Sequence, residues 1–176
     1  MRSLVSRTAG ILALAASAQV QAAQTQNAVN CLQPAEMHGL VAYFLPTVLD
    51  STVKTCSAHL PADAFLRTKA SQLVTTLSAG KDAAWPMAKT AFIKISGRGQ
   101  GDAVLEKMPE EVLRPFIEAA MTAEVAPSIK AKDCKDVDRI AATLEPLPSD
   151  NLVALVTEIL NVAARGDRKI ASCPAA

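Results

Sequence analysis

The chain has 176 residues, with 18 lysines and arginines against 17 aspartates and glutamates, and half of its residues are hydrophobic. The basic residues are scattered and aromatic residues make up only 3% of the chain. It therefore lacks the positive surface and the stacking side chains on which nucleic-acid-binding proteins depend, and no nucleic-acid partner is expected.

The N-terminal segment has the pattern of a cleavable signal peptide. Arg2 and Arg7 form a positively charged start, an apolar stretch covers residues 9–18, and the pattern Val20-Gln21-Ala22-Ala23 then resembles an Ala-x-Ala cleavage site. This apolar stretch is roughly ten residues long, whereas a membrane-spanning helix needs about 20. We therefore expect cleavage after Ala22, with Ala23 as the alternative.

Cleavage leaves about 150 residues, the size of one domain. We expect residues 1–22 to be the signal peptide, residues 23–33 an N-terminal segment, and residues 34–176 a single helical domain. No later apolar run in the sequence is long enough to span a bilayer. The mature chain is therefore expected to be soluble, in the periplasm of a Gram-negative cell or otherwise secreted.

The region from Pro34 to Leu60 admits two interpretations. Its apolar stripe fits either one long helix kinked at Pro46 or a chain that bends sharply there. A single helix as far as Cys56 would be on the order of 33 Å long, and the Cα atoms of a disulfide lie within about 7 Å of each other. One long helix and a bond between Cys31 and Cys56 therefore exclude each other.

Further along, apolar residues recur at helical spacing between start and stop signals. We expect helices from Asp63 to Gly80, from Asp82 to Gly97 with Pro86 in the first turn, from Pro109 past a kink at Pro115, and from Cys134 to Leu144. The expected buried side of the third of these comprises Val112, Leu113, Phe116, Ile117, Ala120 and Met121. Trp85 fits the core stripe of its helix better than a ligand platform.

The clearest helix begins at Ser149, an expected N-cap, and ends before Gly166. Its expected buried face comprises Leu152, Leu155, Val156, Ile159 and Ala163. A short connection through residues 146–148 predicts an antiparallel hairpin with the preceding helix. The chain is therefore expected to be all-α, a compact bundle of about six or seven short helices stapled by two disulfides.

The four cysteines are Cys31, Cys56, Cys134 and Cys173. An even number in an exported chain favours two disulfides, and the C-x-x-C pairs of a zinc site are missing. The predicted hairpin would return Cys173 to Cys134, which leaves Cys31 with Cys56 and requires the bend at Pro46. The two other pairings stay open.

Three groups of residues are candidates for binding. Arg98, in the glycine-rich stretch 97–101, is the best cation for a partner contact, although that stretch lacks the pattern of a P-loop. The carboxylates of Asp133, Asp136 and Asp138 are closely spaced as calcium ligands are, but without the EF-hand pattern, and they also suit a helix start. His38 and His59, with Met37, make a poor copper site unless the fold gathers them. No cofactor or metal is expected.

Nothing in the sequence has the local signature of a catalytic site. There is no G-x-S-x-G elbow, and two disulfides would leave no free thiol. Glu106, Glu118 and Glu158 lie in helical contexts that a solvated face explains.

The arrangement of Leu45-Pro46, Cys56, His59-Leu60-Pro61, Cys134 and Leu144 to Pro148, ending in Cys173-Pro174, resembles small exported four-cysteine proteins of alphaproteobacterial genomes. The resemblance covers most of the mature chain and implies an envelope-side setting in bacteria. It implies no function and no active residue.

Three functions therefore stay open. The first is a non-enzymatic exported interaction module with a protein partner, which a contiguous exposed apolar patch would support. The second is a carrier of a small apolar ligand, which a lined cavity would favour. The third is a hydrolase whose site is assembled from distant residues, which would need His38, His59 or an acidic pair in a cleft.

Overall fold

The structure, a computed structural model, describes residues 31–96, 102–164 and 172–173. These residues form eight α-helices and no strand beyond an isolated bridge, which confirms the predicted all-α fold. The α-helices, all within the compact unit of residues 32–176, are α2 (Pro34–Cys56), α3 (Phe65–Thr68), α4 (Ala70–Ser78), α5 (Lys81–Ser96), α6 (Asp102–Lys107), α7 (Glu110–Val125), α8 (Cys134–Leu144) and α9 (Ser149–Ala163).

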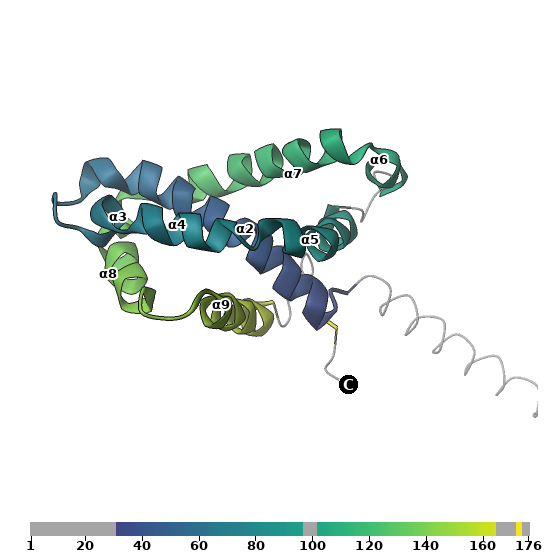
Figure 1. Cartoon of the computed structure of the whole chain (residues 1–176). Coiled ribbons are helices and arrows are strands. Elements are labelled where there is room, and N and C mark those ends of the chain that lie inside the picture. The colour runs from purple at the N-terminus through teal and green to yellow at the C-terminus, as the bar shows by residue number, and fades with distance from the viewer. Residues whose placement is uncertain (1–30, 97–101, 165–171, 174–176) are drawn as a thin grey trace, which may run out of the picture. The chain divides into compact units, whose positions relative to one another are not determined.

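Helix α2 is the centre of the bundle, and α4, α5, α7 and α9 all pack against it (Figure 1). It runs without interruption for 23 residues, so the predicted bend around Leu45-Pro46 is wrong. An internal proline costs a helix about 3 kcal/mol because a hydrogen bond is lost. Pro46 is nevertheless buried, and we attribute the continuity of α2 to the packing of four helices around it.

Among the described helices, α2 and α5 pack most extensively on each other. Gly39 of α2 lies directly against Met87 and Ala88 of α5. Ala88 and Ala91 are almost completely buried there, because short side chains let the two backbones approach. The expected core position of Trp85 is confirmed, since its side chain is buried beside them in the same helix.

The predicted boundaries of the later helices are largely confirmed, with four local differences. The segment after Asp63 forms two helices, α3 and α4, because the backbone departs from helical geometry at Lys69 (φ −124°). Helix α5 starts at Lys81, which places Pro86 inside the helix rather than in its first turn. Helix α7 continues through Pro115. The N-cap of α9 is Pro148 and not Ser149.

The buried faces of α7 and α9 differ from those expected. In α7, Leu113 and Ile117 are buried, but Val112 and Phe116 are about half exposed. In α9, the buried residues are Leu152, Val153 and Thr157, whereas Leu155 and Ile159 are exposed. Each residue turns a helix by about 100°, so α9 is rotated by roughly one residue from the expected orientation.

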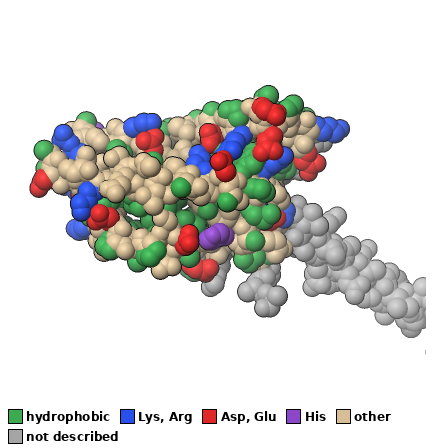
Figure 2. Space-filling view, viewed as in Figure 1, with side chains coloured by type: hydrophobic (Ala, Val, Ile, Leu, Met, Phe, Trp, Pro, Cys, Tyr) green, Lys and Arg blue, Asp and Glu red, His purple; other side chains and the backbone are tan. Residues whose placement is uncertain are grey.

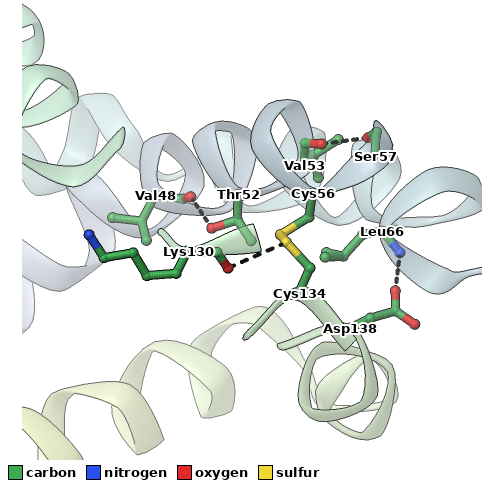
Figure 3. Close-up of a disulfide and its surroundings, with 9 residues drawn as sticks. All are labelled: Val48, Thr52, Val53, Cys56, Ser57, Leu66, Lys130, Cys134 and Asp138. Carbon is green, nitrogen blue, oxygen red and sulfur yellow. Dashed lines mark hydrogen bonds between the residues drawn. A yellow bond between two sulfur atoms is a disulfide. The ribbon is translucent and has the colours of Figure 1, made fainter. Parts of the chain in front are cut away.

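The predicted disulfide pairing is wrong. Cys56, at the end of α2, is bonded to Cys134, at the start of α8, with their Cα atoms 5.4 Å apart (Figure 3). Cys31 and Cys173 form the second pair, and no described cysteine is free. The continuous helix α2 carries Cys56 far from Cys31, and α9 packs mainly on α2 instead of forming a hairpin with α8.

The start of α2 is held by several contacts. The Glu36 carboxylate accepts hydrogen bonds from the Gln33 backbone N–H, at 2.8 Å, and from the Lys94 ammonium of α5, at 2.6 Å. The Cys173 N–H donates to the Leu32 carbonyl at 2.9 Å, which ties the C-terminal segment to the same place. The first turn of α2 is thereby fixed to α5 and to residue 173.

Candidate functional site

The predicted partner contact Arg98, with the whole glycine-rich stretch 97–101, lies outside the described residues. The expected signal peptide, residues 1–22, lies outside them as well.

The two histidines are not brought together. His38 lies in the second turn of α2 and His59 in the 3-10 turn after its end, roughly 30 Å along the helix axis. Met37, beside His38, is buried in the core and faces away from solvent. Within the described ranges, no three His, Cys, Asp or Glu side chains are placed to hold a metal ion.

The three aspartates around Cys134 have separate contacts. Asp138 accepts a hydrogen bond of 2.7 Å from the backbone N–H of Leu66, at the start of α3 (Figure 3). Asp136 pairs with Arg139 one turn along α8. The sequence drew attention to Asp138 as a calcium ligand, whereas the structure gives it the role of joining α8 to α3 next to the disulfide.

A group of polar side chains that the sequence did not indicate links α2, α5 and α7. The fully buried Tyr43 donates a hydrogen bond of 2.6 Å from its hydroxyl to Glu118 and accepts one of 2.9 Å from Arg114. Lys81 pairs with the same Glu118 oxygen at 2.7 Å, and Arg114 also pairs with Asp82. Glu118 remains partly exposed, but its contacts with Tyr43 and Lys81 give it a structural role beyond the solvated one expected. We call these five residues the Tyr43 network.

The electrostatics of the Tyr43 network keep Tyr43 neutral. Burial raises the pKa of Tyr43 to about 12, and the hydrogen bond to Glu118 adds to this, while Arg114 lowers the pKa. Burial also raises the pKa of the Glu118 carboxyl, but the hydrogen bonds from Lys81 and Tyr43 outweigh it and the net pKa is below the ordinary value. The network is a set of satisfied partners that holds three helices together.

Titration of the phenol tests this geometry directly, because Tyr43 is the only tyrosine of the chain. Tyrosinate absorbance at 295 nm should give a midpoint near pH 12 in the folded protein and about 10 in denaturant. The raised folded-state pKa means that the phenol stabilises the fold fully below about pH 10 and loses this contribution as the pH approaches 12.

Two variants of α7 sharpen the measurement. Glu118→Gln should lower the midpoint of Tyr43, because the carboxylate next to the phenol is removed. Glu124→Gln, at an exposed position of the same helix, should leave it unchanged. A native midpoint near 10 in the unmodified chain would contradict the buried hydrogen bonds.

A groove of about 710 Å³ lies between α2, the junction of α4 and α5, and the start of α9. Its lining is mostly small and apolar, with Ala35, Gly39, Ala42, Leu77, Ala79, Gly80, Ala83, Ala84, Met87 and Val153, together with His38, Thr76, Ser149 and Asp150. This volume falls within the range of about 300–1,000 Å³ that small-molecule sites occupy. We call it the α2–α5–α9 groove.

The groove brings His38, Ser149 and Asp150 to one place, which is the kind of assembly that a hydrolase would need. A working nucleophile and base share a hydrogen bond of about 2.6–3.2 Å. Among the described residues no hydrogen bond joins His38 to Ser149 or to Asp150. The groove therefore presents these side chains without a preassembled catalytic pair.

A second, smaller cavity of about 270 Å³ lies between α4 and the loop that joins α8 to α9, where the surface is hollowed (Figure 2). Lys69 and Glu145, both in its lining, form an ion pair at 3.3 Å. Both side chains are exposed, so we regard this pair as a weak contact at the surface.

Helix α9 also exposes large aliphatic side chains. Leu155, Ile159 and Val162 follow one another at intervals of four and three residues, so they form a single stripe on the helix. Their exposed fractions are 39%, 57% and 57%. We call these three residues the α9 stripe; it lies on the side of the helix away from the buried Val153 and Thr157.

The fold and these surfaces define a disulfide-bonded helical bundle whose described helices include none long and apolar enough to cross a membrane. Comparison with known proteins gives no match to a family model, to a curated protein or to a solved structure.

Proposed function

We propose that this chain is an exported, non-enzymatic interaction module that binds a protein partner through the α9 stripe. The single observation that carries the proposal is the exposure of Leu155, Ile159 and Val162 in one row. Burying each of these side chains in an interface would contribute about 1.5–3 kcal/mol at most. Exposed apolar rows of this kind are typical of protein contacts, because binding a partner removes their apolar surface from water.

Three observations support the exported setting. The N-terminal residues carry the charge and hydrophobicity pattern of a signal peptide. All four cysteines are in disulfides, which persist mainly in oxidising compartments. The resemblance to small exported proteins of alphaproteobacteria agrees with a periplasmic location.

Charge substitution in the stripe tests the proposal. The variant Leu155→Lys/Ile159→Lys should abolish binding of the partner, because an interface core does not accommodate two unpaired ammonium groups. Its free energy of unfolding should change by less than about 0.5 kcal/mol, since both positions are exposed. The measurement is site-specific photocrosslinking at Val162 in the host envelope, followed by identification of the linked protein.

The matched control lies on another helix. Ala119→Lys/Ala123→Lys adds the same two side chains, with the same spacing of four residues, at exposed positions of α7. It should leave the crosslinked product in place. Equal crosslinking in both double variants would mean that the α9 stripe does not bind the partner.

The α2–α5–α9 groove favours a second function, which is the binding of a small apolar ligand. Its volume of about 710 Å³ and its lining of alanine, glycine, leucine, methionine and valine side chains are what such a ligand requires. The groove involves other residues than the α9 stripe, so the two functions can be tested separately.

A further inference from the structure

We propose that the α2–α5–α9 groove binds a single-chain amphiphile with a cationic head, such as an alkylammonium, with the chain along the alanine-lined walls and the head at Asp150. This inference rests on the proposed ligand-binding function and adds the chemical class of the ligand. Its basis is the combination of an apolar cavity and the exposed carboxylate of Asp150 in its lining, which pairs with no basic side chain among the described residues.

The walls account for the alkyl chain. Helix α2 contributes Ala35, Gly39 and Ala42, and α5 contributes Ala83 and Ala84. Gly39 is in direct contact with α5 where the two helices cross, so the cavity lies beside this crossing, and the short alanine side chains along it leave the space open. A flexible hydrocarbon chain fills such a space by adapting its torsions, whereas a rigid ring system would meet its irregular walls.

The charge of the lining selects the head group. The described lining residues include Asp150 and no lysine or arginine. In the part of the chain that the structure describes, no lysine or arginine pairs with the Asp150 carboxylate, and His38, which also lines the groove, is exposed. The groove therefore offers one formal negative charge, which attracts a cation and repels a carboxylate or sulfate of equal chain length.

The neighbouring hydroxyl groups fit the same polarity. Ser149 and Thr76 line the groove, and their oxygens can accept hydrogen bonds from an ammonium N–H. An anionic head would instead lie beside the Asp150 carboxylate. The favourable field at the N-terminus of α9 is already taken up by that carboxylate, which occupies its first turn.

Isothermal titration calorimetry of the full mature chain tests the proposal with three ligands of equal chain length, each below its critical micelle concentration: dodecylammonium, dodecanoate and dodecyl maltoside. Dodecylammonium should bind at one site and about tenfold more tightly than dodecanoate, since attraction in one case and repulsion in the other both act through Asp150. Asp150→Asn should reduce this preference to within about threefold.

A second variant locates the site. Ala83→Leu extends a side chain into the groove from an exposed position of α5, and it should weaken dodecylammonium at least tenfold. Ala123→Leu makes the same change at an exposed position of α7 outside the groove and should leave the affinity unchanged. Thermal unfolding of each variant verifies that the fold is retained.

The outcomes separate this inference from the function on which it rests. Equal affinity for the three head groups, with binding blocked by Ala83→Leu, would overturn the cationic head and leave the ligand-binding function standing. If Ala83→Leu left the affinity for dodecylammonium unchanged, the groove would not be the binding site. Absence of binding of all three ligands would overturn both.

Discussion

Removal of the bond between Cys56 and Cys134, in the variant Cys56→Ala/Cys134→Ala, is expected to lower the free energy of unfolding by about 4 kcal/mol. The two cysteines are 78 residues apart, and a cross-link over such a loop restricts the unfolded chain by roughly that amount in the loop-entropy model. For a domain of this size the expected fall in Tm is ~10 °C.

The position of the bond makes α8 the element that should respond most. Helix α8 packs mainly on the short helix α3, and the Leu66 backbone N–H of α3 donates a hydrogen bond to the Asp138 carboxylate of α8. Amide hydrogen exchange should therefore accelerate in α8 more than in the central helix α2. An unchanged Tm, with α8 still protected, would contradict the prediction.

The pairing itself can be verified in the unmodified protein. Trypsin cleaves after lysine and arginine, so Cys56 lies in the peptide of residues 55–67 and Cys134 in that of residues 133–135. These two peptides should be found linked under non-reducing conditions. A link from the peptide with Cys134 to the peptide with Cys173 would support the hairpin pairing instead.

The substitution Gly39→Ala is expected to destabilise the fold by about 2 kcal/mol, although alanine is the better helix former by about 1 kcal/mol. A Cβ atom at position 39 would lie 2.3 Å from the Met87 Cβ and 3.2 Å from the Ala88 backbone nitrogen. A Cβ atom cannot rotate away, so α2 and α5 would have to separate along their crossing. Chemical denaturation monitored by circular dichroism gives the change.

Gly80→Ala is the matched control for this substitution. The added Cβ would meet the Leu77 carbonyl oxygen at 3.7 Å, an ordinary contact. Its effect should stay within about 0.5 kcal/mol of zero. If Gly39→Ala proved as stable as Gly80→Ala, the close approach of α2 and α5 would be wrong.

Sequence reasoning succeeded where a local signal and the tertiary structure agree. Helix α8 begins and ends at the predicted residues, Cys134 and Leu144, and Pro109 precedes α7 as expected. Proline and acidic residues at helix starts act through the backbone of the same turn, so their effect can be read without knowing the neighbours.

The same reasoning failed where packing outweighs a local preference. Pro46 breaks a typical helix, yet α2 is surrounded by other helices and continues through it. The orientation of α9 was misjudged because Leu155 and Ile159 are as hydrophobic as the residues that are buried. Periodicity alone shows that a helix has an apolar side, and only the arrangement of neighbours decides which part of it is covered.

The Tyr43 network and the α2–α5–α9 groove had no sequence signal. Tyr43, Lys81 and Glu118 come from three helices that are distant along the chain, and none of them belongs to a motif. The groove is lined largely by alanine and glycine, which give no distinctive signal in the sequence. Both features depend on how helices cross, which is a property of the assembled bundle.

The two disulfides also set a requirement on how the chain matures. The pairing is nested along the sequence: the two inner cysteines, Cys56 and Cys134, are bonded to each other, and the two outer ones, Cys31 and Cys173, form the second pair. Cys31 is therefore not the partner of Cys56, the next cysteine in the sequence. In the exported setting proposed above, the chain would cross a translocation channel from its N-terminus and expose Cys31 and Cys56 first, so that an oxidant would join the wrong partners. Thiol–disulfide exchange would then have to reopen that bond, and correct oxidation would depend on an isomerase or on α2 forming early enough to hold the two sulfurs apart.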